Sequence, residues 1–149
     1  MTEKLGYQVI ENLGDFEIRL YPPHILVSTV EPGSMATAGN QSFRRLANYI
    51  FGGNNAGKSI AMTAPVLQAQ RESGFTTSFV MPASMSMQQM PSSSDASLTF
   101  VQQPGGKFAA VSFSGLASQP LFDSKAKALK KLLASRQIEI AGEAIYARY

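Results

Sequence analysis

The stretch Ile60-Ala61-Met62-Thr63-Ala64-Pro65-Val66 opens a run of apolar and β-branched residues that predicts a β strand over residues 60–68. A helix is predicted directly before this strand. Four apolar side chains recur there at the i, i+3, i+4 and i+7 spacing of one helix face: Phe43, Leu46, Ala47 and Ile50. We expect the helix to pack against this strand, so that the strand determines which face of the helix remains exposed.

Polar residues and glycines set the limits of this helix. Asn40 or Ser42 is predicted to cap its start, and Gly52-Gly53 is predicted to end it. By periodicity alone, the apolar face of the helix is ordinary core. The cationic pair Arg44 and Arg45 on the same helix favours a second interpretation, in which the helix contacts a ligand.

Alternating apolar residues elsewhere predict a mixed fold. Strands are expected over residues 7–10, 16–21, 24–30, 76–81, 98–102, 107–113, 138–140 and 144–149, and a second helix over residues 120–135. A loop rich in proline, serine and methionine, residues 81–95 (the Met-rich loop), separates two halves with a similar order of elements. The sequence therefore predicts one α+β domain over residues 1–149, built from two pseudo-repeated halves. In the second half, the strand after the helix lacks the neighbour that its counterpart has, which predicts an exposed edge.

The composition fits one globular domain and excludes several classes of protein. Of the 149 residues, 44% are apolar and 15% are charged, as in ordinary folded chains. No apolar run reaches the ~20 residues of a membrane-spanning helix, and the first residues lack the apolar segment of an export signal. We therefore expect a soluble, cytoplasmic protein without a membrane partner. Cysteine is absent and His24 is the only histidine, which excludes disulfides, thiolate metal sites and paired-histidine chemistry within one chain.

The net charge of +3 does not by itself predict a nucleic-acid partner. Five basic residues cluster on the predicted second helix: Lys125, Lys127, Lys130, Lys131 and Arg136. The other side of that helix is apolar, so we interpret the cluster as a solvated face and expect no nucleic acid to bind.

Residues 52–59, Gly52-Gly53-Asn54-Asn55-Ala56-Gly57-Lys58-Ser59, match the phosphate-binding pattern G-x-x-x-x-G-K-[ST]. That loop works between a strand and a helix, because amides at the start of the helix point at the phosphates. Here a helix precedes the loop and a strand follows it, so the carbonyl end of a helix would face any phosphate. We therefore reject nucleotide binding at this loop.

Two further patterns have alternative interpretations. The four thioethers around the Met-rich loop, from Met81, Met85, Met87 and Met90, suit either Cu(I) binding or adaptable packing over an apolar surface; packing is favoured, because such copper sites usually lie outside the cytoplasm. His24 is either a metal ligand or a partly exposed structural residue at the start of a strand. No carboxylate lies near His24 in the sequence and no acidic pair has a telling spacing, so no catalytic centre is predicted.

Six short motifs, taken together, resemble the SOUL heme-binding family. They are Glu17-Ile18-Arg19-Leu20-Tyr21-Pro22, Phe43-Arg44-Arg45-Leu46-Ala47-Asn48-Tyr49-Ile50-Phe51-Gly52, Ile60-Ala61-Met62-Thr63-Ala64-Pro65-Val66, Phe79-Val80-Met81-Pro82, Phe113-Ser114-Gly115 and Ala147-Arg148-Tyr149. The resemblance runs from about Tyr7 to the last residue. Its most specific signal is the pattern I-x-M-T-x-P-V after a helix with F-x-x-L-x-x-Y-I-x-G.

The resemblance implies a distorted antiparallel β-barrel with two helices, built from two similar halves. It also implies binding of heme or another tetrapyrrole in a shallow apolar groove along the first helix. The apolar area of a flat ligand, set against the cost of association, predicts weak, reversible and non-enzymatic binding, as in a carrier or buffer. The residues that the resemblance assigns to this groove are Phe43, Arg44, Arg45, Leu46, Ala47 and Ile50, with the arginines as partners of the propionates. His24 is the one candidate ligand for a heme iron.

SOUL sequences usually continue past the position of Tyr149 into a final strand. We therefore expect this strand to be missing and a sheet edge to stay open, where the chain could self-associate. Two alternative functions remain: a binding module for another hydrophobic small molecule in the same groove, and a protein-interaction module that uses the open edge or the Met-rich loop.

Overall fold

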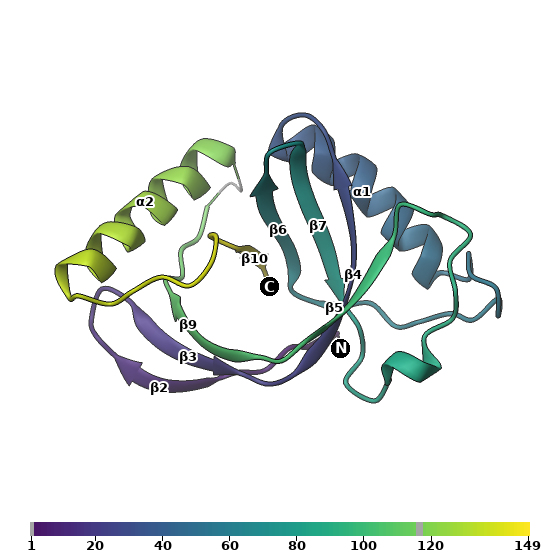
Figure 1. The fold of residues 1–149 in the computed structure, drawn as a ribbon, viewed down its shortest axis with the longest axis horizontal. Helices are drawn as coiled ribbons and strands as arrows, with labels where there is room; N and C mark the ends of the chain where they lie inside the picture. Colours follow the sequence, from purple (N-terminus) through teal and green to yellow (C-terminus); the bar gives the residue numbers. More distant parts are fainter. Residues whose placement is uncertain (1, 116–117) are drawn as a thin grey trace.

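The computed structural model describes residues 2–115 and 118–149 and shows an α+β fold, as predicted (Figure 1). The large sheet has the order β10-β6-β7-β4-β8, with bounds Tyr146–Arg148, Val66–Arg71, Gly74–Val80, His24–Glu31 and Thr99–Gln103. The small sheet has the order β2-β3-β9, with bounds Gln8–Asn12, Glu17–Tyr21 and Gly106–Ala110. Both sheets are antiparallel. A short parallel pair, β1 (Glu3–Lys4) with β5 (Thr63–Ala64), lies beside them.

Two bent ribbons connect the sheets. β3 of the small sheet leads through Pro22-Pro23 into β4 of the large sheet, and β8 leads through Pro104-Gly105 into β9. The bends lie side by side, because β3 pairs with β9 and β4 pairs with β8. Prolines suit this corner, since they have no N–H to offer a ladder. Gly105 has a φ of +78°, and a Cβ at this position would lie 2.3 Å from the carbonyl oxygen of Tyr21.

Tyr149 also joins the two sheets. Its hydroxyl donates a hydrogen bond to the carbonyl of Leu5 at 3.0 Å and lies 3.2 Å from the hydroxyl of Tyr21 in β3. Arg19 of β3 donates to the Tyr21 hydroxyl at 3.2 Å and is only 7% exposed, with Glu17 as its ion-pair partner. This polar chain holds the segment around β10 against the small sheet.

Helix α1 (Met35–Ile50) covers one face of the large sheet (Figure 1). Its Leu46, Tyr49 and Ile50 are at most 1% exposed and pack with Val27 of β4 and Phe79 of β7 in the main core cluster. Helix α2 (Gln119–Ser135) is held less deeply, with Phe122 and Leu133 as its buried residues. The Phe122 ring stacks on Tyr146, with 4.7 Å between ring centroids.

The predicted start of the first helix is wrong. The helix begins at Met35, and its cap is Ser34 rather than Asn40 or Ser42. Ser34 and Thr37 form a reciprocal capping box: the Ser34 amide donates to the Thr37 hydroxyl at 3.1 Å, and the Thr37 amide donates to the Ser34 hydroxyl at 3.2 Å. The helix therefore starts eight residues before Phe43, and Met35 and Ala38 are buried in its first turn.

Two predicted strands also differ from the structure. Residues 60–68 do not form one strand, because Pro65 interrupts the ladder between β5 and β6. Residues 138–140 form no strand, and both isoleucines there are exposed. An alternating pattern is not enough for a strand when no neighbouring strand pairs with it.

The predicted barrel is not closed. In the part of the chain that the structure describes, β9 and β10 each lie at an edge, and no hydrogen-bonded ladder joins the large sheet to the small one. The prediction of two pseudo-repeated halves is not confirmed either. Three strands follow α1 before the Met-rich loop, whereas β10 alone follows α2 in the described residues.

Candidate ligand-binding surface on helix α1

The residues predicted to contact a ligand point in three directions around α1. Successive side chains of an α-helix are about 100° apart, so Leu46 and Ile50, four residues apart, point in nearly the same direction. That direction is towards the sheet. They are 0% and 1% exposed and belong to the main core cluster. Their role in the structure is therefore to hold the helix on the sheet, as expected for ordinary core residues.

Phe43 and Ala47 lie on the flank of α1 that faces β7 and β6. The Phe43 ring is 44% exposed and meets Phe79 of β7 edge-on, with 5.2 Å between ring centroids. Val66 is the cross-strand neighbour of Phe79 and is half-buried against the same core. One side of the Phe43 ring is thus fixed by packing, while the other remains open.

Phe51 extends this flank and was not predicted as a site residue. Phe43, Ala47 and Phe51 follow one another at i, i+4 and i+8, which places them in one row. Phe51 caps the end of the helix and is 68% exposed. The i+4 spacing was a usable signal, but Phe51 was interpreted only as the residue before the glycines that end the helix. We call Phe43, Ala47 and Phe51 the aromatic flank.

Arg45 lies on the opposite flank and is held by its neighbours. Its Nε is 3.2 Å from Glu31 Oε1, and its Nη1 donates to the Ser97 hydroxyl at 2.6 Å and lies 3.7 Å from Asp95 Oδ1. The Ser97 hydroxyl and amide both donate to Asp95, and these hydrogen bonds, with Arg45 nearby, hold the pKa of the Asp95 carboxyl below its usual value. The structure therefore separates Arg45 from Phe43.

Arg44 is the cation on the open side of α1. It is exposed and lies next to Phe43 in the sequence, and the structure gives it no ion pair within residues 2–115 and 118–149. An exposed guanidinium without a protein partner can form two parallel hydrogen bonds with a carboxylate. Of the two arginines predicted to contact a propionate, Arg44 has its donors free.

His24 lies away from this surface. Alternate residues of a strand point to opposite faces, so His24 points to the face of β4 opposite to Ile25, which packs in the core under α1. Its Nδ1 is 2.8 Å from the carbonyl oxygen of Pro22, and this contact assigns the ring proton to Nδ1. Across the described residues, no group of three or more histidine, cysteine or acidic side chains is placed to hold a metal ion.

The loop over residues 52–59 uses its amides within the protein. The amides of Ala56 and Lys58 donate to the Asn54 side-chain oxygen at 3.2 and 3.0 Å, and the Gly57 amide donates to the Asn54 carbonyl at 3.0 Å. The Gly53 amide donates to the Asn48 carbonyl at 2.8 Å. These contacts support the rejection of the phosphate-loop interpretation, because the amides that would hold a phosphate already have partners.

A family model described as "SOUL heme-binding protein" matches residues 2–149. The chain belongs to this family. The match covers both helices and both sheets of the SOUL chain, so the resemblance carried by the six motifs is confirmed. A comparison with curated proteins gave no match. Neither described helix of this SOUL protein is long and apolar enough to cross a membrane.

Proposed function

We propose that this SOUL protein binds heme or another tetrapyrrole reversibly on the aromatic flank of α1, as a non-enzymatic carrier or buffer. The observation that carries the proposal is the exposed row of Phe43 and Phe51 beside Arg44, which has no ion pair among the described residues, in a chain of a heme-binding family. A porphyrin is a flat apolar plate with two carboxylates, so it matches an aromatic row with a guanidinium next to it. Leu46 and Ile50 support the surface from beneath.

The expected affinity is modest. Covering roughly 400 Å² of apolar porphyrin surface contributes about 10 kcal/mol at ~25 cal/mol per Å². Association costs on the order of 4–15 kcal/mol in lost motion and ordered side chains. Because these two terms are similar in size, we expect dissociation constants in the micromolar range or weaker, which suits a carrier better than a protein with a permanent prosthetic group.

The proposal gives iron no part in binding. His24 points to the face of β4 opposite to α1, so we expect metal-free protoporphyrin to bind about as tightly as hemin. A clear preference for hemin would instead indicate an iron ligand that we have not assigned. Equal affinities would also extend the proposal to other flat, anionic hydrophobic molecules of similar size.

Titration with hemin, followed by the Soret band, tests the proposal. Phe43→Asp places a charge where the ring would lie and should weaken binding by at least about tenfold. Phe108→Asp is the matched control, because Phe108 lies in β9 of the small sheet and is 39% exposed. An unsaturable signal in the parent protein, or equal loss in both variants, would contradict the assignment.

A further inference from the structure

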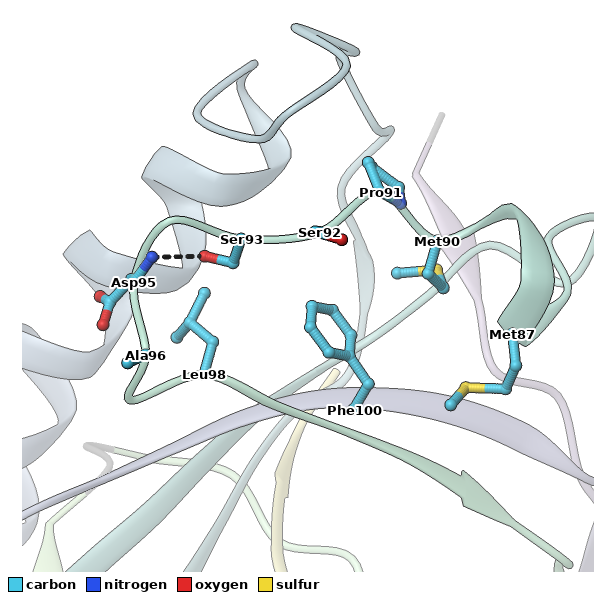
Figure 2. A pocket seen from close by; sticks show the side chains of 9 residues that line it. All are labelled: Met87, Met90, Pro91, Ser92, Ser93, Asp95, Ala96, Leu98 and Phe100. Carbon is cyan, nitrogen blue, oxygen red and sulfur yellow. Dashed lines mark hydrogen bonds between the residues drawn. The ribbon is translucent and has the colours of Figure 1, made fainter.

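A pocket of about 340 Å³ lies between the Met-rich loop and β8 (Figure 2). Phe43 packs instead on Phe79 of β7, which lies on the other side of β4 from β8. We propose that the pocket is a second binding site, for a neutral apolar molecule of about two fused rings. The proposal does not depend on tetrapyrrole binding at the aromatic flank. The residues that line the pocket are Met87, Met90, Pro91, Ser92, Ser93, Asp95, Ala96, Leu98 and Phe100.

The wall of this pocket is mainly apolar. Figure 2 shows Leu98 and Phe100 of one wall facing the loop that carries Ser92 and Ser93, with Met87 and Met90 at one end. Phe100 is half-buried, and its ring lies 5.3 Å from the Tyr49 ring between centroids. Thioethers and an aromatic ring adapt to apolar ligands of varied shape, because methionine has three rotatable bonds and polarisable sulfur.

The loop is held in place without a ligand. The Tyr49 hydroxyl donates to the Pro91 carbonyl at 2.5 Å. Asn55 binds Ser92 in both directions, with its amide donating to the Ser92 carbonyl and its side-chain oxygen accepting from the Ser92 amide, each at 2.9 Å. Arg45 holds the other end through Ser97 and Asp95. A pre-formed pocket binds more tightly than one that must be ordered by its ligand.

The loop over residues 52–59 gains a role from these contacts. Its Asn55 pairs with Ser92, and Asn54 forms a β-bridge with Ser93. The segment that matches a phosphate loop in sequence therefore supports the outer wall of an apolar pocket.

Charge and size together define the ligand class. Among the described residues that line the pocket, Asp95 is the one that ionises, and its Oδ1 already accepts from Ser97 and lies near Arg45. In Figure 2 the carboxylate lies on the side of Asp95 away from Phe100. The pocket thus offers a ligand no unpaired charge beside its apolar wall. An apolar cavity of about 150 Å³ is known to hold one benzene ring, so the volume here suits about two rings.

Fluorescence titration with 6-propionyl-2-(dimethylamino)naphthalene, a neutral probe built on two fused rings whose emission shifts to the blue in apolar surroundings, tests the inference. We expect saturable binding of one probe molecule. Met87→Asp should weaken it by at least about tenfold, because it places a charge at the apolar end of the pocket. Gln88→Asp adds the same charge in the same turn, η1 (Met87–Gln89), but outside the lining, so it should change affinity by no more than about twofold.

Two readouts separate a damaged pocket from a damaged fold. The thermal midpoint and near-ultraviolet circular dichroism of both variants should match the parent, since Met87 is 39% exposed and Gln88 is exposed. Phe43→Asp should leave probe binding unchanged. Equal loss in Met87→Asp and Gln88→Asp, unsaturable binding, or loss of the probe in Phe43→Asp would overturn the assignment of this pocket.

Discussion

The Tyr49 hydroxyl donates a hydrogen bond to the backbone carbonyl of Pro91, with 2.5 Å between the oxygens, and both residues are buried. This contact joins the last turn of α1 to the middle of the Met-rich loop. The Tyr49 ring also packs against Phe100 in β8. One side chain therefore positions the helix, the loop and the strand around the pocket beside the Met-rich loop.

Replacing Tyr49 with phenylalanine should destabilise the protein while keeping the ring contact. The Pro91 carbonyl would lose its partner in a buried position, which costs about 1–3 kcal/mol in the free energy of unfolding. Urea denaturation measures this loss. Tyr146→Phe removes a hydroxyl that donates to Asp123 in a more exposed position, so it serves as the control and should cost less at neutral pH.

Substitution of Arg45 should lower the stability of the protein, whereas substitution of Arg44 should weaken ligand binding. Arg45→Ala leaves Glu31 without its partner and should lower the free energy of unfolding by about 1 kcal/mol. Arg44→Ala should leave stability within about 0.5 kcal/mol of the parent and weaken hemin binding by about fivefold. Parallel urea and hemin titrations of the two variants measure both effects. A larger loss of hemin affinity in Arg45→Ala would place the propionate partner on the Arg45 flank and would contradict the proposed site.

The contrast between these two arginines shows what the sequence could and could not predict. Periodicity identified α1 and its apolar face, because burial repeats every three to four residues. It could not separate the core residues Leu46 and Ile50 from the open flank of Phe43, since all three occupy one broad apolar stripe. It also could not identify the partners of Arg45, because Glu31 and Asp95 lie far from it in the chain and meet it only after folding.

Alternating apolar residues and turn residues likewise predicted part of the strand pattern. Both helices and most strands were predicted from alternation and turn residues, with limits within a few residues for β3, β4 and β7. The Ser34 cap was missed because Gly39-Asn40-Gln41-Ser42 resembles a turn, so the apolar spacing was followed only from Phe43. Residues 138–140 were predicted as a strand although no neighbour pairs with them, because strand pairing depends on distant segments.

Stability should fall at alkaline pH through Tyr146. Burial, together with the hydrogen bond to Asp123, raises the pKa of Tyr146 to about 12. A raised pKa in the folded state means that the stabilising contribution is complete below the unfolded value, about 10, and is lost as the pH rises towards 12. Tyr146→Phe should therefore make the unfolding free energy less dependent on pH between about pH 9 and about pH 11.5. Part of the dependence should remain, since burial also raises the pKa of Tyr149.

Gly105→Ala should disrupt the corner where the two ribbons bend. The added Cβ would lie 2.3 Å from the Tyr21 carbonyl oxygen, and a φ of +78° is unfavourable for alanine. We expect the unfolding free energy to fall by about 2 kcal/mol or more. Gly142→Ala is the control, because nothing lies within 4 Å of a Cβ there. Similar urea midpoints for the two variants would show that the corner can relax around the methyl group.

Leu46 and Ile50 lie on the side of α1 that faces the large sheet, and this has a consequence for how the exposed sides of the helix can change. The two residues hold the helix on the sheet, whereas Phe43 and Phe51 on one flank and Arg45 on the other are largely exposed. We therefore expect substitutions on the Phe43 side to alter the proposed tetrapyrrole surface without moving the contacts around Tyr49, and substitutions around Tyr49 to leave the Phe43 side unchanged. The two proposed binding surfaces therefore lie on opposite flanks of one helix, where they can be altered separately.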